Sequence, residues 1–253
     1  MKILAKIKPR KDTLKSIPVV ILCGGKGMRM GCEELPKPMF NIGDKPILWH
    51  IMSIFAYYGF NNFILSLGYK KEKIEEYFRN YPKWQITFAD TGLDTNTGGR
   101  IKKVDKFINS EIFLATYGDG LSDVNLNSLL SFHRQHKKIA TLVSVRPHYQ
   151  FGIISIDSHT GRVTHFQEKP VLEHWINGGF FIFNRNIFKF IKDDDILESD
   201  VLPRLARDGN LVAYEHTGFW ECMDTYKDNL RLNQLWSSGC APWAVWYKKR
   251  KGK

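Results

Sequence analysis

A run of apolar, mostly β-branched residues, Ile17–Cys23, ends abruptly in a glycine-rich stretch, and this feature constrains the fold more than any other. Such a run predicts a strand buried on both faces, as in a parallel sheet covered by helices. Gly24, Gly25 and Gly27 let the backbone approach a ligand and present its N–H groups. Arg29 adds a planar cation that suits phosphate. The turn predicts a phosphate site, with a plain strand-to-helix connection as the alternative, and matches neither the Walker nor the dinucleotide motif.

Strand-like and helix-like stretches alternate through the first part of the chain. The strand-like stretches are 17–23, 61–68, 84–90, 112–120 and 139–145. Helical spacing of apolar residues occurs in 46–59, 70–81, 98–108 and 126–136. This order predicts an α/β fold, in which a mostly parallel sheet has helices on both faces.

The pattern changes from about residue 146. Closely spaced strands at 151–157, 162–169 and 176–184 predict a small β-rich extension, and helical spacing returns at 200–208 and 228–239. No linker rich in Pro, Gly or Ser separates the two parts. We therefore expect one domain over 18–245, with a nucleotide half to about 145 and an acceptor half from about 146. A basic extension, 1–17, and a basic tail, 246–253, flank it.

Composition excludes several classes of protein. The net charge of +11 lies mostly at the two ends of the chain, so we expect solvated ends, or ends that touch an acidic partner or a membrane surface, rather than nucleic-acid binding. No stretch approaches the roughly 18 apolar residues of a membrane helix, and the N-terminus has no secretory signal. The four cysteines form no Cys-x-x-Cys pair, which argues against a disulfide framework or zinc site and favours a reducing cytoplasm.

Three charged residues follow predicted strands or stiff segments. Lys37 stands between two prolines, which restrict the backbone on either side. Asp119 ends a buried strand between two glycines, and Asp224 lies in an apolar, aromatic setting. Each carboxylate alone is explained by a turn or a helix cap. Together they predict a Mg²⁺ site completed by phosphate oxygens.

Two more charges, Glu168 and Lys169, end a predicted strand. The carboxylate can accept hydrogen bonds from a second substrate, and the ammonium can neutralise that substrate's phosphate. An ion pair at the end of a strand is the competing explanation.

Seven motifs occur in order along the chain: GGKGMR, PKPM, TGGR, YGDG, FQEKP, INGGFF and FWECMDT. The set resembles the sugar-nucleotide pyrophosphorylases. Within them it is similar to the glucose-1-phosphate cytidylyltransferases, also in KPILWHIM, GYK, DTG and APW. The resemblance runs from about residue 18 to 243. It implies a Rossmann-like, GT-A-like nucleotidyltransferase fold, CTP as donor, Mg²⁺ or Mn²⁺ as cofactor, and transfer of CMP to a phosphorylated acceptor with release of pyrophosphate.

The resemblance also implies roles for particular residues. The CTP side comprises Leu22, Gly24, Gly25, Gly27, Arg29, Lys37, Thr95, Arg100 and Gly118. The metal ligands are Asp119 and Asp224. The acceptor side comprises Gly152, Glu168, Lys169, Asn177, Gly178 and Gly179. Arg29, Lys37 and Lys169 are expected to stabilise the charge that moves when an acceptor phosphate oxygen attacks the α-phosphorus.

The chain also departs from the family pattern. Met28 replaces a threonine of the phosphate loop. The segment between GYK and DTG is shorter than in the family, so the family's hexamer is not implied. We expect a homo-oligomer of unspecified size. RPHYQ and VLEHW contain bulky residues where the family has small loops, so they could reshape the acceptor pocket. Ordinary surface loops explain these residues equally well.

An extra cation there, Arg146, can meet a carboxylate on the acceptor. These features suggest the branch of the family that transfers CMP to phosphorylated L-glutamine for capsular phosphoramidate, with glucose 1-phosphate as the alternative acceptor. A non-catalytic CTP-binding subunit is a further alternative. Such a subunit would not need Lys37, Lys169, Asp119 and Asp224, and their presence in this chain therefore argues against it.

Overall fold

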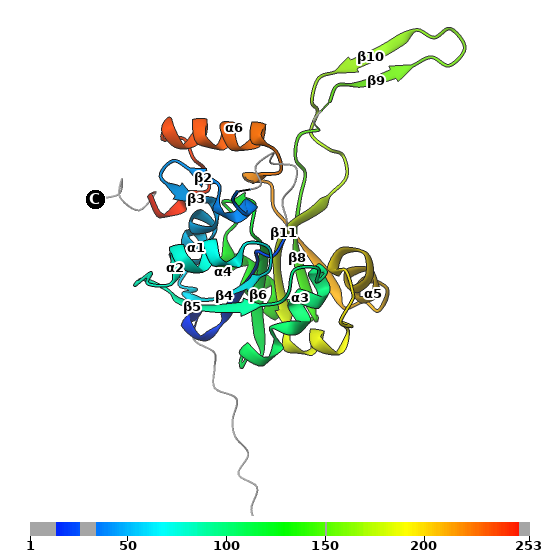
Figure 1. Ribbon diagram of the computed structural model, residues 1–253. Coiled ribbons are helices and arrows are strands. Elements are labelled where there is room, and N and C mark those ends of the chain that lie inside the picture. The colour runs from blue at the N-terminus through cyan, green and yellow to red at the C-terminus, as the bar shows by residue number, and fades with distance from the viewer. Residues whose placement is uncertain (1–13, 26–33, 150, 248–253) are drawn as a thin grey trace, which may run out of the picture.

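The computed structural model describes residues 14–25, 34–149 and 151–247. Its centre is a seven-stranded sheet in the order β12-β8-β11-β6-β1-β4-β5 (Figure 1). The strands are β1 (Pro18–Leu22), β4 (Asn62–Leu67), β5 (Gln85–Asp90), β6 (Ile112–Tyr117), β8 (Ala140–Val145), β11 (Ile176–Asn184) and β12 (Leu211–Glu215). Only β11 runs antiparallel to its neighbours, β6 and β8. The predicted mostly parallel α/β sheet is confirmed.

Helices cover both faces of the sheet, because side chains of β1 point alternately to two apolar cores. Val19 and Ile21 pack with α1, α2, α4 and α6, whereas Val20 packs with α3 and α5. The helices are α1 (Ile47–Tyr57), α2 (Lys71–Phe78), α3 (Thr97–Lys103), α4 (Leu126–His136), α5 (Leu202–Arg207) and α6 (Tyr226–Ser237). Shorter helical turns are η1 (Leu14–Ser16), η3 (Lys37–Met39), η4 (Asp105–Phe107), η5 (Arg185–Lys189) and the π-helical η6 (Leu197–Val201). None of the helices in these described ranges has the length and apolarity that crossing a membrane requires.

One expectation about a single element is wrong, and one strand of the central sheet was not expected. The helix expected over 98–108 ends at Lys103, and a separate turn, η4, follows it. The strand β12, at the edge of the sheet, was not expected at all. Its side chains are only partly buried, so its sequence lacks the continuous apolar run of the central strands.

Short pairings position the segments around the sheet. β2 (Asn41–Ile42) pairs with β3 (Lys45–Pro46), and β7 (Gly120–Ser122) pairs antiparallel with β13 (Trp220–Cys222). The second pairing places Cys222 opposite Gly120, although the two are far apart in sequence. It therefore brings Asp119 and Asp224, which flank this ladder, to the same end of the sheet.

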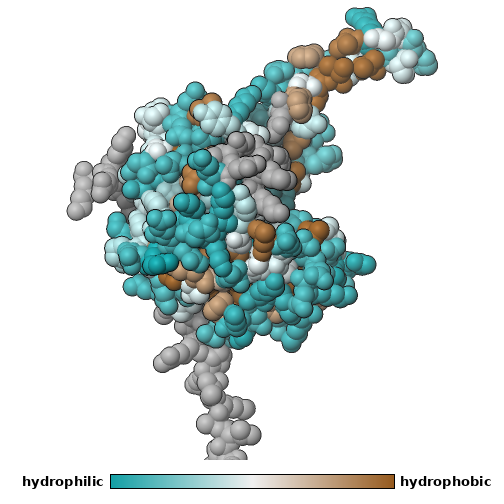
Figure 2. Space-filling model, in the orientation of Figure 1, coloured by the Kyte–Doolittle hydropathy of each residue, from teal (hydrophilic) through white to brown (hydrophobic). Residues whose placement is uncertain are grey.

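The predicted β-rich extension is a hairpin of β9 (Ile153–Ile156) and β10 (Val163–Gln167), which projects from the body (Figure 1). Its apolar side chains are exposed, and Figure 2 shows them gathered along the hairpin. Two stretches, 146–149 and 168–175, connect the hairpin to β8 and β11. We call these two stretches the stem. The backbone N–H of Leu172 donates to the carbonyl of Pro147 at 2.9 Å across it.

Candidate active site

A cavity of about 580 Å³ lies at the carboxyl ends of β1 and β6, beside the loop that follows β5. This is where ligands bind in open α/β sheets, next to the strand at which the strand order reverses. The predicted residues that line it are Leu22, Gly24, Gly25, Lys37, Thr95, Arg100, Gly118, Asp119 and Asp224. Gly27 and Arg29, also predicted for this site, lie outside the described residues.

Lys37 joins two carboxylates at the mouth of this cavity. Its Nζ lies 2.7 Å from Oδ2 of Asp119 and also donates to Oδ1 of Asp224. The side chains of Lys37, Asp119 and Asp224 are 13%, 22% and 37% exposed, so water screens the cluster only partly. Burial alone lowers the pKa of the Lys37 ammonium, but the charge of Asp119 and the hydrogen bonds to both aspartates outweigh it and raise the pKa above its usual value. Lys37 therefore stays charged.

Backbone contacts hold the two aspartates in place. The N–H of Met223 donates to the carbonyl of Asp119 at 2.9 Å, which continues the pairing of β7 with β13. The N–H of Asp224 donates to Oδ2 of Asp228 at 3.0 Å, and Thr225 with Asp228 forms a capping box at the start of α6. Thr225 and Asp228 therefore cap α6, and capping does not explain the position of the Asp224 side chain.

The cluster also brings together side chains that could hold a divalent cation. Ligand atoms of Asp119, Cys222 and Asp224 all lie within 4.8 Å of one another. Burial raises the pKa of the Cys222 thiol, which leaves the two carboxylates as the anionic groups that could hold a cation. Oxygen ligands of this kind, completed by phosphate oxygens and water, suit Mg²⁺ or Mn²⁺.

Arg100 supports the floor of the cavity. Its Nη1 donates to the Thr91 hydroxyl at 2.7 Å and to the Leu67 carbonyl at 3.1 Å. Its Nη2 donates to the carbonyls of Gly24 and Leu93, both at 3.1 Å. A Cβ on Gly24 would lie 1.9 Å from Nη1, so glycine is needed for this contact. Both Nη atoms bind protein oxygens, and Arg100 ties the glycine turn to the loop after β5.

The residues predicted for the acceptor side lie elsewhere. Gly152 immediately precedes β9 of the hairpin, Glu168 and Lys169 belong to the stem, and none of the three lines the cavity. Lys169 and Glu168 are exposed, with Nζ 3.6 Å from Oε1, as the ion-pair explanation expected. Lys169 also has a left-handed backbone, φ 45°, which is uncommon for a residue other than glycine.

Asn177 and Arg146 each contact an aromatic side chain. Asn177 leads toward the cavity, because its Nδ2 lies 3.5 Å from Oη of Tyr117, which lines it. Gly178 accepts a hydrogen bond from Nε1 of Trp220 on its carbonyl at 2.7 Å. The guanidinium of Arg146 lies 4.6 Å from the ring centre of Trp175, across the stem.

Comparison with known proteins decides the family. The model of the nucleotidyl transferase family matches residues 18–236, most of the chain. The chain belongs to the nucleotidyl transferase family. It is a nucleotidyltransferase, and its resemblance to the glucose-1-phosphate cytidylyltransferases is confirmed.

Two relatives match along nearly their whole length. A probable glucose-1-phosphate cytidylyltransferase of Bacillus subtilis (strain 168) is 43% identical, over 90% of this chain and 99% of the relative. The glucose-1-phosphate cytidylyltransferase of Salmonella typhimurium is 41% identical, over 90% of this chain and 98% of the relative. The crystal structure of HddC from Yersinia pseudotuberculosis, complexed with GMP-PN, has a TM-score of 0.69 over 87% of this chain and 99% of HddC. Its identity of 24% supports the fold alone.

The sequence did not single out four residues of this candidate site. Cys222 lies beside the two aspartates, whereas Thr97, Tyr117 and Glu198 line the cavity. Thr97 and Tyr117 belong to the quoted motifs TGGR and YGDG, so their position beside a site was visible. Glu198 belongs to none of these motifs, and only the packing of η6 against α3 brings it to the cavity.

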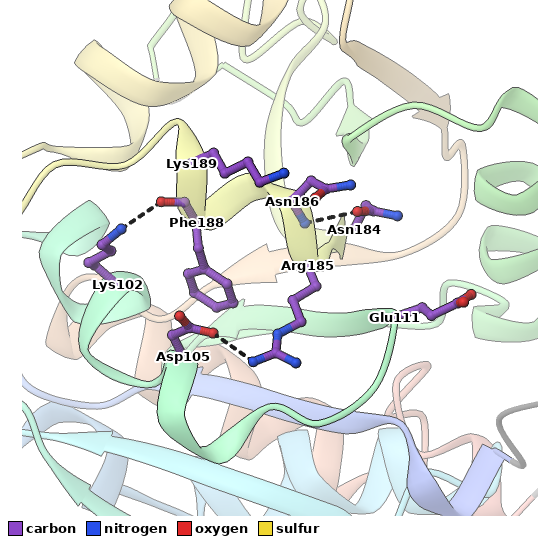
Figure 3. Close-up of a pocket in the computed structure, with 8 residues that line it drawn as sticks. All are labelled: Lys102, Asp105, Glu111, Asn184, Arg185, Asn186, Phe188 and Lys189. Atoms are coloured by element: carbon purple, nitrogen blue, oxygen red, sulfur yellow. Dashed lines mark hydrogen bonds and ion pairs between the residues drawn. The ribbon is translucent and has the colours of Figure 1, made fainter. Parts of the chain in front are cut away.

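A second cavity of the nucleotidyltransferase, about 730 Å³, lies near the opposite ends of the central strands, where β6 begins and β11 ends (Figure 3). Nζ of Lys102 donates to the Phe188 carbonyl at 2.6 Å, and Arg185 pairs with Asp105 at 3.4 Å. The dashed lines in Figure 3 show that these cations bind groups of the protein itself. None of the residues predicted for the site lies there.

Proposed function

We propose that this nucleotidyltransferase transfers CMP from CTP to a phosphorylated acceptor and releases pyrophosphate. The observation that carries the proposal is the contact of Lys37 with both Asp119 and Asp224, beside the glycine turn that follows β1. A protein that only bound a nucleotide would not need two carboxylates and an ammonium at one point. The names of the relatives that are 41% and 43% identical support CTP as the donor.

The residues have separate tasks in this proposal. The backbone at Gly24 and Gly25 receives the triphosphate, and Asp119 with Asp224 holds Mg²⁺ or Mn²⁺. The cation, when bound, neutralises charge on the phosphate oxygens. Lys37 stabilises the charge that develops on the α-phosphate and the departing pyrophosphate.

The attacking group is an oxygen of the acceptor phosphate. Because that phosphate is largely dianionic near neutral pH, no general base is needed, and positioning with charge stabilisation supplies the catalysis. Lys169 is proposed to reduce the repulsion between the two sets of phosphates. Its left-handed backbone supports a positioning role, since strained residues cluster at functional sites.

For the acceptor we propose L-glutamine phosphate. We propose that the reaction runs in the cytoplasm and serves the synthesis of a bacterial capsule. Arg146, held over the Trp175 ring, supports this choice, because a guanidinium suits the α-carboxylate of an amino acid. No carboxylate among the described residues pairs with Arg146. Glucose 1-phosphate is the second candidate, and the names of the relatives favour it.

The test is pyrophosphate release by the purified protein with CTP, Mg²⁺ and each acceptor in turn. We expect release with phosphoglutamine, at a kcat/KM at least tenfold above that with glucose 1-phosphate. Asp119→Asn is the matched control, because it removes one anionic ligand without changing the shape of the side chain. Efficient turnover of the sugar phosphate alone would contradict the acceptor, and no release with any phosphorylated acceptor would contradict the reaction.

A further inference from the structure

Three side chains from distant parts of the chain meet at one edge of the active-site cavity. Tyr117, the last residue of β6, donates a hydrogen bond from Oη to Oε1 of Glu198, in η6. Oε2 of Glu198 accepts from Oγ1 of Thr97, the first residue of α3, at 2.7 Å. The N–H of Leu197 donates to the same Thr97 oxygen at 2.9 Å. Tyr117, Thr97 and Glu198 all line the cavity, and both oxygens of the carboxylate are oriented by hydroxyl groups.

The backbone that carries Glu198 is fixed against the start of α3. The N–H of Gly99 donates to the Asp195 carbonyl at 3.1 Å. A Cβ on Gly98 would lie 2.5 Å from that carbonyl oxygen, and one on Gly99 would lie 2.2 Å from the carbonyl oxygen of Asp193. Because only glycine permits this contact, the TGGR motif fixes the place of the Glu198 carboxylate.

Tyr117 extends the network to β11. Nδ2 of Asn177 lies 3.5 Å from Oη of Tyr117, and the other end of that amide accepts from the N–H of Gly179 at 2.9 Å. The Tyr117 ring packs on Gly179, where a Cβ would lie 2.5 Å from the ring and φ is +75°. The network thus joins Glu198 to the strand predicted for the acceptor side.

We propose that Glu198 is a specificity-determining residue of the acceptor subsite. Its carboxylate accepts hydrogen bonds from donor groups of the acceptor: the α-ammonium of phosphoglutamine, or hydroxyls of glucose 1-phosphate. This inference rests on the proposed function. A carboxylate repels phosphate oxygens, so the group that meets Glu198 in this cavity is a hydrogen-bond donor rather than a phosphate. Each oxygen of Glu198 keeps a lone pair after its bond from Tyr117 or Thr97. Tyr117 and Thr97 are positioning residues.

Glu198→Gln tests the proposal, because it keeps the shape of the side chain and removes its charge. The measurements are kcat and KM for the acceptor and for CTP, from pyrophosphate release, and the Kd of CTP by calorimetry. We expect the KM for the acceptor to rise at least tenfold, as for a lost hydrogen bond to a charged group, and the Kd of CTP to change less than twofold. Glu76→Gln, an exposed glutamate on α2, is the matched control and is expected to match the parent.

Tyr117→Phe gives a second, graded test, because it removes the hydroxyl and keeps the ring on Gly179. We expect a rise of three- to tenfold in the KM for the acceptor, with an unchanged melting temperature. A rise in the Kd of CTP with an unchanged acceptor KM would overturn the proposal, since Glu198 would then bind the ribose. Unchanged values for both substrates in Glu198→Gln would also overturn it. A parent protein that releases no pyrophosphate with any phosphorylated acceptor overturns the proposed function itself.

Discussion

Replacing Lys37 with methionine leaves Asp119 and Asp224 facing each other without the ammonium between them. Removing one partner of a buried ion pair costs about 3–5 kcal/mol, and exposed pairs contribute about 0–1 kcal/mol. The cluster lies between these limits, because the Lys37 side chain is 13% exposed and that of Asp224 is 37% exposed. We expect Lys37→Met to lower the free energy of unfolding by about 1–3 kcal/mol in EDTA.

Divalent cation should restore most of that loss, because a cation bound by the two carboxylates stabilises the folded state. The assay is urea unfolding of parent and variant in EDTA and in millimolar MgCl₂ or MnCl₂. Lys71→Met is the control, since Lys71 pairs with Asp90 on the surface, and we expect its stability to stay near that of the parent with either buffer. Catalytic turnover of Lys37→Met should fall about a hundredfold or more. A variant as stable as the parent in EDTA would refute this reasoning.

Two further predictions concern the floor of the cavity and the apolar core. Gly24→Ala should lower the free energy of unfolding by about 1–3 kcal/mol, because the new Cβ would meet the Arg100 side chain. Gly25→Ala, whose Cβ would have nothing within 4 Å, should change the free energy of unfolding by under about 0.5 kcal/mol. Urea unfolding compares the two variants, and equal effects would contradict the role of Arg100. Stability should also fall from about pH 6.5 toward pH 4, because burial lowers the pKa of His50 and of His133 to about 4 and the unfolded chain therefore takes up these protons first. His50 should contribute up to about 3 kcal/mol of this fall. His50→Gln, whose amide can still donate to the Ile42 carbonyl that His50 contacts at 2.9 Å, should flatten this slope, and an unchanged slope would exclude His50 as its source.

The sheet and the nucleotide edge of the site followed from local signals. Periodicity of 2 or 3.6 is a property of neighbouring residues, so the central strands and most helices were predictable. Residues that end parallel strands meet at one edge, which is why Gly24 and Asp119 were expected together. The strand β12 escaped because it is half exposed at the edge of the sheet, and its residues lack a clear pattern.

The remaining parts of the site depend on contacts between distant segments. Glu198 reaches the cavity only because Gly98 and Gly99 let α3 touch the segment before η6. Cys222 joins the two aspartates through the pairing of β13 with β7, two strands of three residues each. Neither element has a sequence period long enough to be recognised. Lys169 was assigned by a motif, but its position on an exposed stem follows from the hairpin's projection out of the body.

The most direct measurement is the anomalous scattering of manganese in crystals grown with CTP and MnCl₂. We expect a peak within about 2.5 Å of carboxylate oxygens of both Asp119 and Asp224, with the triphosphate over Gly24 and Gly25 and the α-phosphorus within reach of Lys37. Manganese bound away from these two carboxylates, or CTP lodged outside the cavity at the end of β1, would contradict the proposed reaction.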